Sequence, residues 1–272
     1  MTDNELKITA AKVREGIVTA VYSAASGHPG GSLSAADMYT YLFFEEMNID
    51  PKNPRDRKRD RFVLSKGHTS PGYYSALANR GFFPVEDLKT FRKLGSYLQG
   101  HPCMNETPGV DMSSGSLGQG LSAATGMALA GKLKGEDYRV YTLLGDGEIQ
   151  EGQIWEAAMF AGAHKLDNLT VIVDNNDLQI DGRVADVCNI YPIDKKFEAF
   201  NFNVINIDGH DFAQIRDAFA KARETKGMPT AIIMKTTKGK GVSFMEDNAG
   251  WHGKAPNAEE YEKAIAEIRS AI

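Results

Sequence analysis

The chain has 272 residues, of which 42% are hydrophobic, so it is long enough to bury a substantial core. Its 31 Lys and Arg residues against 36 Asp and Glu residues give a formal net charge of −5, which excludes the broad basic surface that binds nucleic acid or an anionic membrane. The two cysteines, Cys103 and Cys188, fit neither a disulfide framework nor a CxxC metal pair, and neither a signal peptide nor a membrane-spanning run is apparent. We expect a cytoplasmic globular protein.

The predicted elements alternate between helices and short apolar strands. Apolar residues at helical spacing predict an opening helix from Leu6 to Val21 that ends before a glycine-rich turn at 27–31. A basic run at 55–61, interrupted by acids, is expected to be a solvated loop. Apolar runs predict buried strands at 62–65, 140–144, 169–173, 204–207 and 231–234, and helical patterns lie at 34–46, 117–134, 154–166, 212–225 and 257–271.

Strands that look buried on both faces and alternate with helices predict an α/β fold. The sheet is expected to be doubly wound and mostly parallel, with helices on both faces. Because no internal repeat or linker is apparent, residues 1–272 are expected to form one domain. Ligands of such folds bind outside the carboxyl ends of the strands, so the residues just after each apolar run are the candidates for chemistry.

Polar residues follow two of these strands. Gly145-Asp146-Gly147 comes after the run at 140–144, and Asp174-Asn175-Asn176 comes after the run at 169–173. The glycines permit close approach of a phosphate, and the oxygens of Asp146 and Asn176 are hard ligands that suit Mg²⁺. Each motif alone is also common in plain turns. Their combination indicates a metal that bridges the protein to a diphosphate.

Four of the six histidines have a glycine neighbour and lie in predicted turns: His28, His68, His101 and His252. A single turn histidine is usually a solvated or capping residue. Imidazoles can also bind sugar hydroxyls and phosphate and can relay protons near neutral pH. A zinc cluster is the rival interpretation, but the sequence has neither HExxH nor a short paired ligand spacing.

Together these motifs resemble the cofactor site of thiamine-diphosphate enzymes, and their flanking residues resemble the transketolase family. The stretches that carry the resemblance are Ser26–Gly30, Leu64–His68, Gly115–Gly120, Gly145–Gly152, Leu178–Gly182, Lys238–Val242 and Trp251–Pro256. The resemblance therefore spans nearly the whole chain. It implies thiamine diphosphate and Mg²⁺ as cofactors, with Ca²⁺ or Mn²⁺ able to replace Mg²⁺.

The resemblance implies a ligand set for this metal and diphosphate. Asp146, Asn176 and the main-chain oxygen of Leu178 would bind the metal, and Asn176 would also contact the cofactor. Gly147 would lie beside the diphosphate.

Roles for the turn histidines follow from the same resemblance. His68 and His252 would lie near the diphosphate. His28, His101 and also His252 would line the channel to the thiazolium carbon, where they would act as catalytic residues.

Three further residues are implicated in the same way. Gly115 and Leu117 would lie against the aminopyrimidine of the cofactor. Glu151 would lie at an interface between subunits and link two cofactor sites, and it would also complement the dipole of the helix that it begins. By contrast, Asp211 is expected simply to cap the next helix, and we assign no catalytic role to His210.

In transketolases a glutamate on a separate pyrimidine-binding domain activates the cofactor. That domain and a C-terminal domain follow the segment represented here, so both are expected on a partner chain. We therefore expect the N-terminal subunit of a split transketolase, which forms an α2β2 heterotetramer with a C-terminal subunit. It would transfer a two-carbon ketol unit from a ketose phosphate to an aldose phosphate, as in the pentose phosphate pathway.

Several alternatives stay open at this point. The substrate could be an unusual sugar phosphate or a sulfosugar, because split relatives serve dedicated catabolic routes. The chain could also be a non-catalytic cofactor-binding subunit. The α chain of a 2-oxo-acid dehydrogenase and deoxyxylulose-phosphate synthase share the Gly-Asp-Gly element, but His28-Pro29-Gly30 fits transketolase better.

Overall fold

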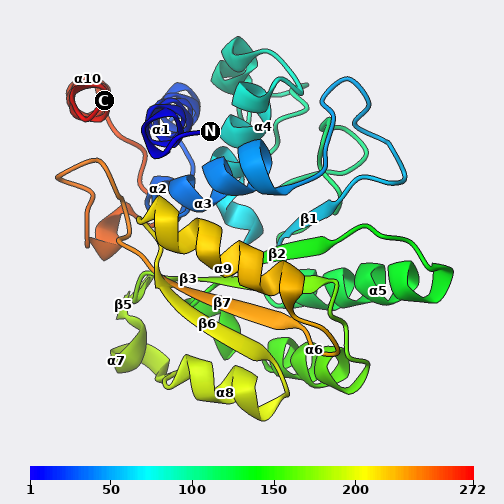
Figure 1. Ribbon diagram of the computed structural model, residues 1–272. Helices are drawn as coiled ribbons and strands as arrows, with labels where there is room; N and C mark the ends of the chain where they lie inside the picture. Colours follow the sequence, from blue (N-terminus) through cyan, green and yellow to red (C-terminus); the bar gives the residue numbers. More distant parts are fainter.

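A parallel sheet of five strands, in the order β1-β2-β3-β7-β6, forms the centre of the protein in a computed structural model that describes residues 1–272 (Figure 1). Every neighbouring pair is parallel, and β2 and β3 are in register so that Gly145 pairs with Asp174. The prediction of a doubly wound, parallel α/β sheet is confirmed. The strands are β1 (Arg61–Leu64), β2 (Val140–Gly145), β3 (Leu169–Asn175), β6 (Asn203–Asp208) and β7 (Thr230–Lys235).

Helices cover both faces of this sheet (Figure 1). Successive residues of a strand point to opposite faces, so Leu143 joins the core on one face and Leu144 joins the core on the other. The first core contains side chains from α1 (Asp3–Ala24), α3 (Ala36–Tyr41), α4 (Ser70–Arg80) and α9 (Phe212–Glu224). The second contains side chains from α5 (Gln119–Lys134), α6 (Gly152–Ala163) and α8 (Ile193–Ala199).

A third apolar cluster joins α1 to the C-terminal helix α10 (Ala258–Ser270). Both helices begin with a capping box, made by Thr2 with Glu5 and by Asn257 with Glu260. The predicted cap of α9 is confirmed, because Asp211 Oδ1 accepts hydrogen bonds from the amides of Ala213 and Gln214 at 2.8 and 3.2 Å. None of the helices combines the length and apolar character needed to cross a membrane.

The structure differs from the predictions near the N-terminus. The expected turn at 27–31 instead opens a helix, α2 (Pro29–Ser34), because proline is well suited to the first helical position. The expected helix at 34–46 consists of α3 and a π-helical turn, Leu42–Glu46. Helix α4 was not predicted. Other short elements are β4 (Leu178–Gln179), β5 (Gly182–Arg183), α7 (Val184–Cys188) and 3-10 turns at Gly67–Thr69, Val85–Thr90, Gly147–Gln150 and Ala249–Trp251.

One prediction about burial is wrong, and another holds only in part. Strand β6 was expected to be buried on both faces, but it lies at the edge of the sheet and its residues are half-buried or exposed. The basic run at 55–61 was expected to be a solvated loop, and it is for the most part an exposed or half-buried loop before β1, yet Arg59 is buried and forms an ion pair with the buried carboxylate of Asp111. Residue type alone does not reveal such a pairing, because Asp111 is distant in the sequence.

Candidate functional site

A cavity of about 470 Å³ lies at the carboxyl end of the sheet, where β1, β2 and β3 end. Strands that run parallel deliver the residues that follow them to one edge, which explains why distant motifs meet here. The cavity is lined by every residue that the sequence singled out for the site, namely His28, His68, His101, Gly115, Leu117, Asp146, Gly147, Glu151, Asn176, Leu178 and His252.

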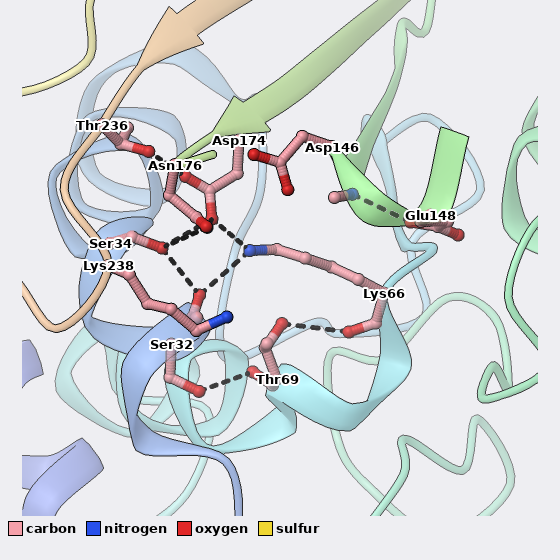
Figure 2. Close-up of polar contacts among 12 residues, drawn as sticks. Ser32, Ser34, Lys66, Thr69, Asp146, Glu148, Asp174, Asn176, Thr236 and Lys238 are labelled. Atoms are coloured by element: carbon pink, nitrogen blue, oxygen red, sulfur yellow. Dashed lines mark hydrogen bonds and ion pairs between the residues drawn. The ribbon is translucent and has the colours of Figure 1, made fainter. Parts of the chain in front are cut away.

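Two of the expected metal ligands, Asp146 and Asn176, directly follow β2 and β3 (Figure 2), and the third, Leu178, is on β4. Asp146 is 2% exposed, and its carboxylate accepts hydrogen bonds from the amides of Gly147, at 2.8 Å, and of Asp177. The Asn176 Oδ1 atom accepts from the amide of Leu178 at 3.2 Å. These contacts hold a carboxylate, an amide oxygen and a main-chain carbonyl close together. Such a set of hard oxygens fits Mg²⁺ and leaves coordination positions for phosphate oxygens and water.

Electrostatics at this point favour a bound cation. Burial and the neighbouring charge of Asp174 raise the pKa of Asp146 to about 7. A divalent cation favours the ionised carboxylate and would offset this destabilisation. Burial also lowers the pKa of Lys238 to about 8. The Lys238 ammonium donates to the Leu178 carbonyl oxygen at 2.9 Å, so it lies directly beside the ligand set.

Asp174 forms a buried polar cluster beneath the cavity that the sequence analysis missed (Figure 2). Its Oδ2 atom accepts from Lys66 Nζ and Ser34 Oγ, each at 2.5 Å, and its Oδ1 atom accepts from Thr236 Oγ1. Burial alone would raise the pKa of Asp174, but Lys66 and these hydrogen bonds lower it below its ordinary value. The carboxylate is therefore ionised and holds Lys66 in place.

Two ammonium groups line the cavity, and neither was assigned to the site from the sequence. Lys66 follows β1 and also donates to the Gly31 carbonyl oxygen at 3.0 Å, whereas Lys238 follows β7. Both are at least nine-tenths buried, and lysine is rarely buried without a function or a partner. Their position just after strands was the available signal. Two cations beside a metal site suit the charge of a diphosphate.

Three of the histidines form a compact group. The ring centroids of His28, His68 and His252 lie 5.0 to 5.3 Å apart. Burial lowers the pKa of His28 to about 4 and of His252 to about 3, and it lowers the pKa of His68 well below its usual range. Burial, and then the charge of Arg92, also lowers the pKa of His101. All four are therefore neutral at pH 7.

Neutral imidazoles offer one donor and one acceptor each. Lys238 Nζ lies 3.0 Å from His252 Nδ1, and an ammonium can only donate, so His252 carries its proton on Nε2. His28 Nδ1 is buried without a hydrogen-bond partner in the protein. Buried polar atoms without a partner are rare in folded proteins. No group of three or more His, Cys, Asp or Glu side chains is arranged to hold a metal ion.

The loop that contains Gly115 and Leu117 is held by Glu148. This buried carboxylate accepts hydrogen bonds from the Ser65 hydroxyl and from the amides of Gly118 and Gly145, the last two at 3.0 and 2.9 Å. It thus joins the ends of β1 and β2 to the start of α5. Gly115 packs directly on His101, because an added Cβ would lie 3.0 Å from that ring. Sequence reasoning did not single out Glu148.

Leu117 and Glu151 lie at the rim of the cavity. Leu117 is 37% exposed, and Ile180, on the short β4–β5 hairpin, is 69% exposed. Glu151 is exposed and immediately precedes α6, as predicted, but its side chain makes no capping hydrogen bond. The rim therefore presents apolar side chains and an uncommitted carboxylate beside a polar cavity.

The residues present fit a metal-bound diphosphate cofactor. Hard oxygens stand beside two ammonium groups, and four neutral imidazoles line the same cavity. Comparison with known proteins agrees with this chemistry. Residues 6–270 match the family model described as "Transketolase, thiamine diphosphate binding domain".

Named relatives fall into two groups. The chain is 46% identical over 242 residues to the 6-deoxy-6-sulfo-D-fructose transketolase subunit SqwG of Clostridium sp. (strain MSTE9), covering 89% of this chain and 88% of that protein. It is 42% identical to an apulose-4-phosphate transketolase subunit of Phocaeicola vulgatus, covering 98% of this chain and 95% of that protein. It is also 45% identical to human transketolase, covering 98% of this chain but only 42% of that protein.

Solved structures give the same result. The crystal structure of transketolase from Campylobacter jejuni superposes with a TM-score of 0.93 at 38% identity, covering 99% of this chain and 43% of that one. The protein thus matches two transketolase subunits along most of their length and a part of the single-chain enzymes. The chain belongs to the transketolase family, in which it corresponds to the thiamine-diphosphate-binding domain.

Proposed function

We propose that this chain is the diphosphate-binding subunit of a split transketolase whose donor is a dedicated sugar substrate rather than a common pentose phosphate. The observation that carries this proposal is the similarity to relatives of matching length, which are named as transketolase subunits for 6-deoxy-6-sulfo-D-fructose and for apulose 4-phosphate. These names support the sulfosugar or unusual sugar phosphate alternative better than the pentose phosphate pathway. The reaction class remains transfer of a two-carbon ketol unit.

Thiamine diphosphate, when bound, supplies the electron sink for breaking a carbon–carbon bond beside a carbonyl group. The protein's contribution is to hold it. In the proposed site, Asp146, Asn176 and the Leu178 carbonyl oxygen bind Mg²⁺. This assignment is supported by their convergence at the ends of β2 and β3.

Four groups are proposed to hold the diphosphate directly. The ammonium groups of Lys66 and Lys238 balance its charge, and the cavity-lining His68 and Gly147 stand beside it. Asp174 keeps Lys66 in place, because their buried ion pair fixes the ammonium at the wall of the cavity.

We assign substrate handling to His28, His101 and His252. Their pKa values lie below the usual range, so each can donate one hydrogen bond and accept another at neutral pH. This state suits recognition of sugar hydroxyls and proton exchange with them. The clearest support is that all three side chains line the same cavity.

A partner chain is proposed to complete the site. It would carry the pyrimidine-binding domain with its activating glutamate, and it would cover the rim at Leu117, Gly115 and the exposed Ile180. Glu151, uncommitted at the rim, is proposed to lie at an interface between subunits of an α2β2 heterotetramer. Large apolar side chains beside a polar cavity support a protein surface as their cover.

The test is a ketol-transfer assay on this chain alone and with its partner, in the presence of Mg²⁺ and thiamine diphosphate. The donors are 6-deoxy-6-sulfo-D-fructose, apulose 4-phosphate and xylulose 5-phosphate, each with an aldose phosphate acceptor. Turnover of either of the first two, only in the mixture, is expected. Preference for xylulose 5-phosphate would contradict the proposal of a dedicated donor sugar. Activity of this chain alone would contradict the proposal that two chains form the active site. Cofactor binding without turnover of any donor would favour the non-catalytic alternative.

A further inference from the structure

A cluster of charged side chains lies outside the cofactor cavity, behind the loop Thr237–Lys240. At its centre is Asp37 on α3, which is 5% exposed. Its Oδ2 atom accepts a hydrogen bond from Arg14 Nη2 at 2.6 Å and lies 2.8 Å from His210 Nδ1. None of the three side chains lines the cavity, so the proposed chemistry leaves this cluster without a role.

Two members of the cluster hold the two ends of the loop. The Thr237 amide donates to His210 Nε2 at 2.9 Å, and Arg14 Nε donates to the Lys240 carbonyl oxygen at 3.1 Å. Because an amide can only donate, His210 Nε2 is the acceptor and the proton of the ring is on Nδ1, which donates to Asp37. Asp37 thereby sets the tautomer that the loop requires.

The middle of the loop is packed as tightly as its ends. The Gly239 amide donates to the Gly30 carbonyl oxygen at 2.9 Å. Gly239 has a φ of +79°, and an added Cβ would lie 2.3 Å from the Met245 carbonyl oxygen. The loop therefore has no room to take another course while its neighbours stay in place.

Lys238 lies between the two held ends, and its ammonium reaches Leu178 and His252 in the cavity. We propose that Asp37, His210 and Arg14 act as a positioning cluster that fixes the Thr237–Lys240 loop and thereby directs Lys238 into the cofactor site. The inference rests on the proposed function, because it deepens the role of Lys238 there. His210 touches neither the cavity nor its proposed ligand, so it is a positioning residue and not a catalytic one.

Two substitutions separate the two contacts of His210. In His210→Asn the side-chain amide can replace Nδ1 as the donor to Asp37, but nothing remains at the position of Nε2. In His210→Gln the side-chain oxygen can reach the position of Nε2 and accept from the Thr237 amide. The proposal therefore requires the Gln variant to rescue what the Asn variant loses. His164→Asn, at an exposed histidine after α6, is the matched control.

The first readout is binding of Mg²⁺–thiamine diphosphate to the assembled two-chain complex, measured by calorimetry. The affinity is expected to fall by up to about tenfold in His210→Asn, because the loss of one hydrogen bond lowers the population of the binding-competent loop by at most about that factor, and to stay close to native in His210→Gln and His164→Asn. The second readout is amide hydrogen exchange at 237–240 without any ligand. Exchange is expected to be faster only in His210→Asn.

Native affinity and native exchange in His210→Asn would overturn the proposal, as would equal losses in the Asn and Gln variants. If His210→Asn did not fold, Arg14→Lys tests the other end of the loop, because lysine can keep the ion pair with Asp37 while removing the Nε contact with Lys240. Native exchange at 237–240 in Arg14→Lys would also overturn it. Because amide exchange is measured without cofactor or sugar, it tests the positioning cluster even if the protein does not catalyse the proposed ketol transfer.

Discussion

Lys66 Nζ lies 2.5 Å from Asp174 Oδ2, although the two residues are 108 positions apart in the sequence (Figure 2). Their side chains are 3% and 1% exposed. The same carboxylate also accepts hydrogen bonds from Ser34 at the end of α2 and from Thr236 after β7. One buried charge thus connects four segments around the cavity. Its partner Lys66 is one of the two ammonium groups that face the proposed diphosphate.

Removing the cation of this pair should destabilise the fold. In Lys66→Met the Asp174 carboxylate would remain buried without its ion-pair partner, which typically costs about 3–5 kcal/mol. Urea unfolding without cofactor measures this free energy. The matched control is Lys195→Met at the exposed pair with Glu198, where solvent screening leaves little or no change in stability to expect. A similar change in both variants would show that the buried pair contributes little.

Substitution of Asp146 should separate stability from cofactor binding. Its pKa is raised from an ordinary 3.8 to about 7, so the folded state binds more protons than the unfolded state between these values. The contribution of Asp146 to the free energy of unfolding is therefore lost as pH rises from about 4 to 7, and Asp146→Asn should lack this loss. Urea unfolding without divalent cations at pH 4 and at pH 8 measures the difference between the two proteins. Relative to the native protein, Asp146→Asn should have a higher free energy of unfolding at pH 8 than at pH 4.

The same variant should bind the cofactor poorly. Asp146 is the charged member of the proposed ligand set, so the Mg²⁺-dependent affinity for thiamine diphosphate should fall by more than the about 10–100-fold that outer-shell changes cost. Calorimetry with and without Mg²⁺ measures this loss. Native affinity in Asp146→Asn would refute the metal site.

Glu148 should matter for the loop that carries Gly115 and Leu117. In Glu148→Gln the NH2 group of the side chain would face a backbone amide that now donates to the carboxylate. A buried donor left without a partner costs about 1–3 kcal/mol. Urea unfolding would report the change, as would faster exchange of whichever amide, Gly118 or Gly145, then faces the new donor. Glu156→Gln, at an exposed position of α6, is the control and should stay within about 0.5 kcal/mol of native. Unaltered exchange of both amides in Glu148→Gln would contradict the assigned contacts.

His28 should make stability depend on pH. Its pKa is about 4 in the folded protein against an ordinary 6.5, so the unfolded chain takes up the proton first as pH falls. The contribution of neutral His28 to the free energy of unfolding is fully present above pH 6.5 and is lost as pH falls towards 4. Urea midpoints across this range should vary less in His28→Asn than in the native protein, whereas exposed His164→Asn should match native. Identical profiles for His28→Asn and native would mean that His28 is not desolvated as the structure shows.

His28→Ala should also distinguish substrate handling from metal binding. In the assembled enzyme, kcat is expected to fall while the affinity for Mg²⁺–thiamine diphosphate changes little, because His28 lines the cavity without belonging to the ligand set. Steady-state kinetics and calorimetry on the same preparation measure the two quantities. Equal losses in both would indicate that His28 mainly supports the local fold.

Local sequence patterns were sufficient for most of the fold. Continuous apolar runs located β1, β2, β3 and β7, and helical periodicity located α1, α5, α6, α9 and α10 to within a few residues. Strand β6 was located but its burial was not, because apolar content does not reveal that a strand lies at the edge of a sheet. Helix α2 was missed because the glycines of Pro29-Gly30-Gly31 usually indicate a turn.

By itself, the sequence placed Asp146, Gly147 and Asn176 at the carboxyl edge of the sheet, because they directly follow two predicted strands, and its resemblance to transketolases supplied the other candidates for the cavity. Only the tertiary structure decided which distant groups support them. Lys66 meets Asp174, and His210 meets Asp37 and Thr237, through contacts between segments far apart in the chain. Burial turns such encounters into strong constraints, because a charged or polar group away from water must find a partner, and no local pattern specifies which partner the fold will bring.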